Sequence, residues 1–246
     1  MNKEWMNKIC RKFGFELHGL GYMQSLKKAG IQQHPFSIQK EITGNNVKVI
    51  FDIGANRGDT VMEYKNYFPD AGIYAFEPFP LSFTQLCTRT NEYKDICCFQ
   101  NAVADSEGTK IMYVNQNVDT NSLLPSVKMG LQSDNQVITK EEIEVQTITI
   151  DAFCEKQRIT QIDILKMDIQ GGELSALMGA NKLLSGKKIK LIYTESFFKE
   201  QYLDQPLFYD IAKYLKNFDY HLQDIYNPYY GNGAIAWCDA MFLPEV

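Results

Sequence analysis

A carboxylate and two glycines stand at fixed spacing where an apolar segment ends. The segment reads VKVIFDIGANRGD from Val47, and Asp52, Gly54 and Gly58 within it make the pattern DxGxxxG. Glycines let the backbone approach a ligand closely, and the first amides of a helix that begins near Asp59 lack partners within that helix. A strand, a glycine turn and a helix in this order are suited to a nucleotide-like ligand.

A second acid, Glu77, stands at the end of the next apolar segment, GIYAF. A carboxylate in this place can accept hydrogen bonds from both hydroxyls of a ribose. Dinucleotide-binding loops usually contain GxGxxG, whereas an acid begins the loop here. An acid suits a cationic ligand, and S-adenosylmethionine carries an ammonium and a sulfonium but no phosphate. The two acids therefore favour a methyltransferase over a nicotinamide-dependent oxidoreductase.

Polar residues are also expected at the ends of three further strands. They are Asn101 and Ala102 in the third strand, Asp168 after the fourth and Glu195 after the fifth. In open parallel sheets, ligands gather outside the carboxyl ends of the strands. We therefore expect these residues to converge with Asp52 and Glu77.

Methyl transfer is an in-line displacement that depends mainly on holding the acceptor and the methyl group close and aligned. An alcohol acceptor also needs a base within hydrogen-bond reach. We expect Asp168 to be that base, and Glu195 is the second candidate. The two carboxylates could instead hold a divalent metal ion, although no metal site is predicted.

Alternating strands and helices must position these residues. The first strand begins at Val47 and ends before Asp52. Later strands are expected at 73–77, 96–104, 162–167, 190–194, near 220 and at 234–243, and helices at 59–68, 80–91, from about 173 and around 208–216. This alternation implies an α/β fold with a parallel sheet. Two strands at 109–115 and 142–148 interrupt it, and they flank a long polar stretch, 116–140, of a length that is usually functional or disordered.

The composition is that of a globular protein with one domain. The chain has 246 residues, of which 45% are hydrophobic, and its net charge of -5 gives no general attraction to nucleic acid. Nucleic-acid substrates are therefore not expected. We divide the chain into an N-terminal helical extension, 1–45, and one domain, 46–246. The extension interleaves basic and apolar residues, and we interpret it as a capping helix rather than a membrane-surface anchor.

The cysteine pattern bears on the compartment. Six cysteines without a CxxC pair argue against a zinc or disulfide framework and favour a reducing, cytoplasmic location. No segment reaches the roughly 18 apolar residues of a membrane span. The first residues also lack the apolar core of a signal peptide.

The chain resembles the FkbM family of S-adenosylmethionine-dependent methyltransferases. The matching segments, from about residue 47 onward, are FDIGANRGD (51–59), YAFEPFP (74–80), NAVAD (101–105), NSLLP (121–125), QTITIDAF (146–153), ILKMDIQGGE (164–173) and DAMFL (239–243). The resemblance implies a class I methyltransferase fold, in which a mostly parallel seven-stranded sheet carries helices on both faces. It also implies methyl transfer to a hydroxyl of a sugar or a secondary metabolite.

The same resemblance implies roles for single residues. Asp52, Gly54, Ala55, Asn56 and Gly58 would line the methionine end of the cofactor, Glu77 would hold the ribose, and Asn101, Ala102 and Asp105 would flank the adenine. Asp168 would face the transferred methyl group. Arg57 and Gln170 depart from the family pattern, which usually has an acid in place of Gln170.

Other functions stay open beside this one. A non-catalytic module could keep the fold and bind a partner through 116–140 and the N-terminal extension, and an N-methyltransferase could act on a small metabolite. The run NPYY (227–230) superficially resembles an amide-recognition motif, but it follows the sixth strand rather than the fourth. The aromatic stretch 226–233 is either a platform for a sugar or a tight turn, and His221 is interpreted as structural.

These observations together predict a methyltransferase with an alcohol acceptor. We expect S-adenosylmethionine as the cofactor and a small molecule or glycan precursor as the acceptor. No oligomeric state is predicted.

Overall fold

The computed structural model describes residues 34–127, 137–231 and 233–245. The chain divides into two compact units, 1–38 and 39–246, and both sheets and the candidate site belong to the second. Most of the predicted N-terminal extension and part of the predicted polar stretch 116–140 lie outside the described residues. Helix α3, Pro35–Thr43, is the first described element. No helix among the described residues is both long enough and apolar enough to cross a membrane.

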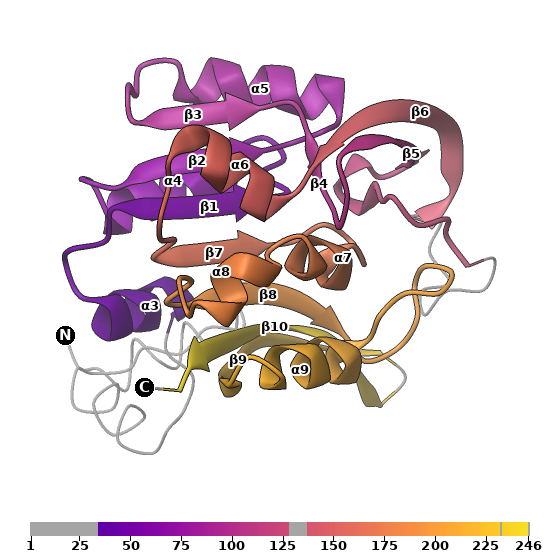
Figure 1. The fold of residues 1–246 in the computed structure, drawn as a ribbon. Helices are drawn as coiled ribbons and strands as arrows, with labels where there is room; N and C mark the ends of the chain where they lie inside the picture. The colour runs from indigo at the N-terminus through magenta and orange to yellow at the C-terminus, as the bar shows by residue number, and fades with distance from the viewer. Residues whose placement is uncertain (1–33, 128–136, 232, 246) are drawn as a thin grey trace, which may run out of the picture. The chain divides into compact units, whose positions relative to one another are not determined.

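A seven-stranded sheet forms the centre of the second unit, in the order β3-β2-β1-β7-β8-β10-β9 (Figure 1). Its strands are β1 (Val49–Ile53), β2 (Gly72–Phe76), β3 (Ile96–Phe99), β7 (Ile164–Met167), β8 (Ile192–Phe197), β9 (Tyr220–Gly231) and β10 (Ala234–Pro244). The first five of these run parallel to one another, whereas β10 pairs antiparallel with both β8 and β9. The predicted mostly parallel seven-stranded sheet is confirmed.

Helices cover both faces of this sheet. They are α4 (Asp59–Tyr67), α5 (Pro80–Thr90), α6 (Ile150–Gln157), α7 (Glu173–Met178), α8 (Asn181–Ser185) and α9 (Phe208–Lys216). Buried side chains of α6 to α9 share one apolar cluster with Phe51, Leu165 and Ile192 of the central strands, whereas α4 lies behind the sheet in the view of Figure 1. The central strands read as apolar runs because both of their faces are covered.

A second, three-stranded sheet follows β3 and has the order β4-β6-β5. Its strands are β4 (Ala102–Val103), β5 (Gly108–Asn115) and β6 (Thr139–Ile148), and a short 3-10 helix, η1 (Val118–Thr120), follows β5. The predicted pairing of 109–115 with 142–148 is confirmed as the antiparallel β5 and β6. The single third strand predicted at 96–104 is wrong, because the chain leaves the large sheet after Phe99 and pairs β4 with β6 instead.

Two predicted strand ends also differ from the structure. Asp52 lies inside β1, because β1 is paired with β2 and β7 on both sides through Ile53. Glu195 lies inside β8, because the long antiparallel β10 extends the pairing to Phe197 and places Glu195 opposite Asp239. Both acids were expected just after their strands. Helix α6, which no helix pattern predicted, fills the connection from β6 to β7.

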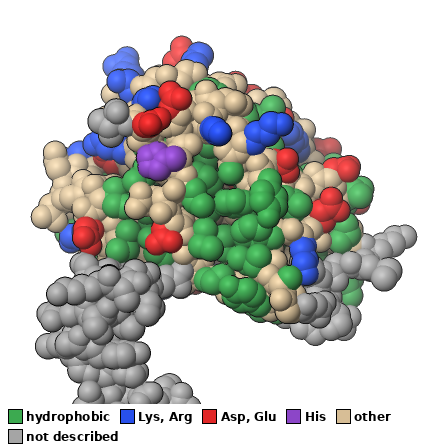
Figure 2. All heavy atoms as spheres, turned by 90° about the horizontal axis from the view of Figure 1, so that it is seen from below, with side chains coloured by type: hydrophobic (Ala, Val, Ile, Leu, Met, Phe, Trp, Pro, Cys, Tyr) green, Lys and Arg blue, Asp and Glu red, His purple; other side chains and the backbone are tan. Residues whose placement is uncertain are grey.

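The far edge of the large sheet is formed by β9. The aromatic stretch that begins at Tyr226 belongs to this strand, with Tyr229 stacked on Trp237 of β10 at a centroid distance of 5.4 Å. His221 also lies in β9, as the sequence predicted. Figure 2 shows hydrophobic side chains gathered on the face seen from below the view of Figure 1.

Gly54 directly follows β1 and packs against the backbone of Asp168, which directly follows β7. It has φ +78°, and a Cβ on this residue would overlap the backbone carbonyl oxygen of Asp168. The amide of Asp168 in turn donates to the carbonyl of Ile53 at 3.0 Å. Only glycine therefore fits where the first strand turns toward the helix.

We expect Gly54→Ala to lower the free energy of unfolding by more than the strain of placing alanine in a left-handed backbone conformation. Gly44 has φ +72° with nothing within 4 Å of its would-be Cβ, so Gly44→Ala measures the left-handed strain, about 1–2 kcal/mol. Gly54→Ala should cost about 1–3 kcal/mol more through overlap with packed backbone. Urea unfolding of both variants checks this, and equal losses would contradict it.

Candidate active site

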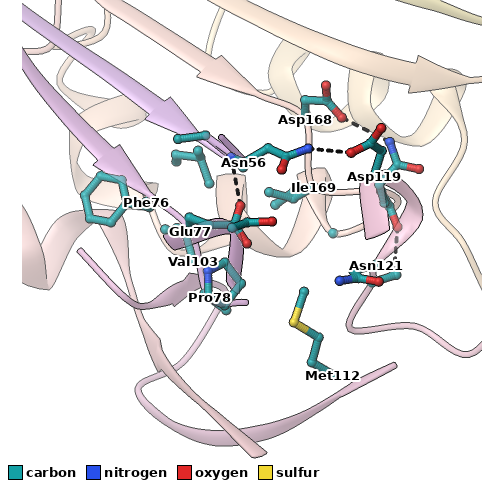
Figure 3. Close-up of a pocket in the computed structure, with 18 of the residues that line it drawn as sticks. Asn56, Phe76, Glu77, Pro78, Val103, Met112, Asp119, Asn121, Asp168 and Ile169 are labelled. Carbon is teal, nitrogen blue, oxygen red and sulfur yellow. Dashed lines mark hydrogen bonds between the residues drawn. The ribbon is translucent and has the colours of Figure 1, made fainter. Parts of the chain in front are cut away.

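A cavity of about 310 Å³ lies outside the carboxyl ends of β1, β2 and β7 (Figure 3). Its walls come from the loop after β1, from the residues after β2 and β7, from β4 and from the segment that follows β5. Parallel α/β sheets bind ligands in this place, because connections that leave the strand ends in different directions open a crevice there. The cavity is the candidate site.

The cavity brings together many of the residues that the sequence singled out. Those that line it are Gly54, Ala55, Asn56, Glu77, Asn101, Ala102 and Asp168. Asp52, Gly58, Asp105 and Glu195 are not among the lining residues. Gly58 is the N-cap of α4, and Asp105 forms an ion pair with Lys110 at 2.9 Å. Asp52 and Glu195 lie behind the cavity wall, where other side chains contact them.

Glu77 is held by the backbone at the end of β2. Its Oε2 accepts a hydrogen bond from the amide of Asn56 at 2.8 Å, and its Oε1 accepts one from the amide of Phe79 at 2.9 Å. Burial raises the pKa of Glu77 to about 7, although the two backbone hydrogen bonds oppose that rise. Each carboxylate oxygen keeps a further lone pair for a hydroxyl donor.

Lys166 is the site residue that the sequence reasoning missed. Its Nζ lies 2.9 Å from Asp52 Oδ1, 3.2 Å from the Gly54 carbonyl oxygen and 3.9 Å from Asp168 Oδ2. Burial lowers the pKa of Lys166, but the charges of Asp52 and Asp168 together raise it above its ordinary value. The sequence does contain a signal for this role, a single lysine within the apolar strand segment ILKM. A lysine in such a strand is buried, and buried lysines are almost always paired with an acid.

Asp52 completes this buried ion pair. It is fully buried, and burial raises its pKa while Lys166 opposes the rise. Its Oδ2 has no hydrogen-bond donor among the residues that the structure describes. Asp52 is therefore placed to neutralise Lys166 under the cavity floor rather than to contact a ligand directly.

Gln170 links the two candidate catalytic acids. Its Nε2 donates to Asp168 Oδ1 at 3.0 Å and to Glu195 Oε2 at 2.6 Å, and its Oε1 accepts from the hydroxyl of Tyr202 at 2.8 Å. Burial, and then the charge of Asp168, raises the pKa of Glu195 well above its ordinary value. Glu195 is thus favoured as a neutral acid behind Gln170, while Asp168 lines the cavity.

The segment after β5 closes over the loop after β1. Asn56 Nδ2 donates to Asp119 Oδ1 of η1 at 2.8 Å, and Arg57 Nη2 lies 3.2 Å from the same oxygen. Figure 3 shows Asn56 and Asp119 on the same side of the cavity as Asp168. The exposed ion pair adds little stability, so its main effect is to orient these side chains.

The donors and acceptors of the cavity fit a ligand with hydroxyls and an ammonium. Besides Glu77, the cavity contains Asn56, whose Oδ1 is buried and has no hydrogen-bond donor among the described residues. S-adenosylmethionine presents ribose hydroxyls and an ammonium as donors, and both match these acceptors. No cluster of three or more His, Cys, Asp or Glu suited to a metal ion occurs within the described ranges.

Comparisons with known proteins agree with this geometry. Residues 52–222 match the family described as the methyltransferase FkbM domain. The chain is 26% identical over 167 residues to the 2-O-methyltransferase NoeI of Sinorhizobium fredii, covering 65% of each protein. It is 27% identical over 157 residues to methyltransferase sdnD of Sordaria araneosa, covering 54% of this chain and 60% of the relative. Each match spans less than two thirds of the relative's length.

One solved structure shows the same fold. An rRNA methylase from Streptococcus thermophilus superposes with a TM-score of 0.50 at 9% identity, covering 87% of this chain and 98% of that one. At this identity the likeness concerns the fold alone. The arrangement of the large sheet is therefore that of class I methyltransferases.

We expect Lys166→Met to destabilise the protein by about 3–5 kcal/mol at pH 7, because it leaves the buried charge of Asp52 unpaired. The double variant Asp52→Leu/Lys166→Met should recover most of that loss, since it removes both charges. Lys182, which forms an exposed pair with Glu155, provides the control: Lys182→Met should stay within about 0.5 kcal/mol of wild type. Chemical denaturation measures all three, and a mild Lys166→Met variant would refute the role of the pair.

Proposed function

Since the chain belongs to the FkbM methyltransferase family, we propose that it transfers a methyl group from S-adenosylmethionine to a hydroxyl of a sugar, a glycan precursor or a secondary metabolite. The observation that carries this proposal is one cavity lined both by a backbone-held carboxylate, Glu77, and by a second carboxylate, Asp168. The relative NoeI is named a 2-O-methyltransferase, which supports an alcohol acceptor.

We assign the cofactor to the side of the cavity formed by the ends of β1 and β2. Glu77 would accept the ribose hydroxyls, and the unpartnered Oδ1 of Asn56 would accept a hydrogen bond from the ammonium. Asn101 and Ala102 would flank the base, as the sequence predicted. When bound, S-adenosylmethionine supplies an electrophilic methyl group, so the protein's task is to orient the acceptor oxygen and remove its proton.

Asp168 is the proposed base. It lines the cavity, and its side chain is 45% exposed, so an acceptor hydroxyl can reach it. The Gln170 amide donates to its Oδ1, and the Lys166 ammonium lies 3.9 Å from its Oδ2, so both oxygens of the carboxylate have a neighbour that orients them. Asp168 would take the proton of the acceptor hydroxyl as the new bond forms.

Glu195 takes a different role in this proposal from the one that the sequence suggested. It lies behind Gln170 and is not among the residues that line the cavity. A neutral carboxyl there would not compete with Asp168 for the acceptor proton. We therefore propose Glu195 as a positioning residue that acts through Gln170.

The test of cofactor class is isothermal titration with S-adenosylmethionine and, in parallel, with NAD. We expect wild type to bind S-adenosylmethionine and Glu77→Gln to lose at least about tenfold in affinity, because a charge-assisted hydrogen bond contributes roughly 1.5–3 kcal/mol. The pKa of Glu77 is about 7, so ionising the carboxyl requires a pH above that value. Wild-type affinity should therefore fall as the pH drops from 8 to 6, and the Gln variant should show no such fall.

Two results of this titration would contradict the proposal. Tighter binding of NAD would indicate an oxidoreductase. Binding of neither cofactor would favour the non-catalytic alternative.

We expect Asp168→Asn to keep cofactor affinity within a few fold of wild type and to lower turnover by about 10²–10⁴, the usual effect of a general base. Turnover is followed as transfer of labelled methyl from S-adenosylmethionine to a panel of mono- and oligosaccharides. Asp70→Asn, at an exposed position outside the cavity, is the matched control. Unchanged turnover in Asp168→Asn would exclude Asp168 as the base.

A further inference from the structure

Asn121 carries a buried amide group whose donor is unused. The residue follows η1 and is 8% exposed. Its Oδ1 accepts a hydrogen bond from the backbone amide of Asn115 at 2.8 Å, which fixes the orientation of the side-chain amide. Its Nδ2 is buried and has no hydrogen-bond acceptor among the described residues.

An unused buried donor of this kind calls for an explanation. A buried polar group without a partner destabilises the folded protein, and nearly all such groups in proteins are satisfied. Asn121 lines the cavity, and Figure 3 shows its amide nitrogen directed into the cavity beside Met112 and across from Glu77. A ligand in the cavity is the natural acceptor.

The position of Asn121 selects one part of the cofactor, and this step rests on the proposed function. With the ribose at Glu77 and the methyl group near Asp168, the base must occupy the remaining part of the cavity. That part is bounded by Val103 and Met112, whose apolar side chains suit the faces of a planar ring. Asn121 stands at its edge.

The chemistry of the amide then limits the contact. An NH₂ group donates hydrogen bonds and accepts none. The edge of adenine presents ring nitrogens as acceptors and one exocyclic amine, whose N–H groups are donors. Nδ2 can therefore pair with a ring nitrogen and not with the N–H groups of the amine.

We propose that Asn121 Nδ2 donates a hydrogen bond to a ring nitrogen of the cofactor's adenine, so that the segment after β5 recognises the base. With this assignment Asn121, from the connection between β5 and β6, joins Asn101 and Ala102 as a residue that contacts the base. It also differs from the sequence-based expectation for Asp105, which pairs with Lys110 instead.

The test uses S-adenosylhomocysteine and its 1-deaza, 3-deaza and 7-deaza analogues, in each of which one ring nitrogen is replaced by C–H. Isothermal titration of wild type should show that one analogue binds about tenfold more weakly than the parent compound, the effect of about 1.4 kcal/mol for one lost hydrogen bond. The other two analogues should bind like the parent. Equal binding of all four compounds to wild type would overturn the proposal.

Asn121→Asp supplies a matched variant. It keeps an oxygen for the amide of Asn115 but replaces the donor by a second oxygen, so it should bind S-adenosylhomocysteine at least about tenfold more weakly and no longer discriminate against the sensitive analogue. Asn91→Asp adds the same charge at an exposed position and should behave as wild type. Retained discrimination in Asn121→Asp would also overturn the assignment.

The wild-type arm of this experiment does not depend on whether a variant folds. It also separates the two proposals. Failure of wild type to bind S-adenosylhomocysteine at all would refute the proposed function, and with it this assignment. Tight binding of the parent without discrimination among the analogues would refute only the role of Asn121.

Discussion

The buried ion pair of Asp52 and Lys166 is the interaction on which the site depends. The two residues are register partners on adjacent parallel strands, β1 and β7, and both are nearly or fully buried. The Lys166 ammonium also reaches the Gly54 carbonyl and lies near Asp168. One buried cation therefore ties the floor of the cavity to the turn after β1 and to the proposed base, and each charge stays buried only because the other is present.

The acids of the site differ in their surroundings rather than in their chemistry. Glu77 is buried but held by two backbone amides, Asp168 lines the cavity beside an ammonium and an amide, and Glu195 is buried behind Gln170. Acids of one site that lie in different environments can take separate roles. In this chain Gln170 separates Asp168 from Glu195 with an uncharged donor, at a position where an acid would add a further negative charge beside Asp168.

The three-stranded sheet completes the cavity. The chain leaves the large sheet after β3 and returns through β6, and the segment after β5 supplies Asp119 and Asn121 to the cavity wall. The hydroxyl of Ser122 donates to the carbonyl of Gln170 at 2.7 Å, so this segment is also joined to the residues after β7. The three-stranded sheet and its connections therefore enclose both the proposed cofactor side and the proposed acceptor side of the cavity. The alternating strands and helices of the large sheet alone would leave the cavity open there.

Residue patterns alone were enough to predict the alternating strands and helices, and the family resemblance predicted the seven-stranded sheet. They also predicted that Glu77 and Asp168 would line one site, because parallel strands end at one edge of a sheet. The residues that lie between these two acids became known only from the folded structure. Asp52 and Glu195 were expected to follow their strands, yet β1 is paired on both sides past Asp52, and pairing with β10 extends β8 past Glu195. The partners Lys166, Gln170 and Asn121 gain their roles from contacts with residues in other elements or from lining the shared cavity. Local patterns record periodicity and turns, whereas hydrogen bonds and ion pairs between distant residues form only once packing has fixed their distances.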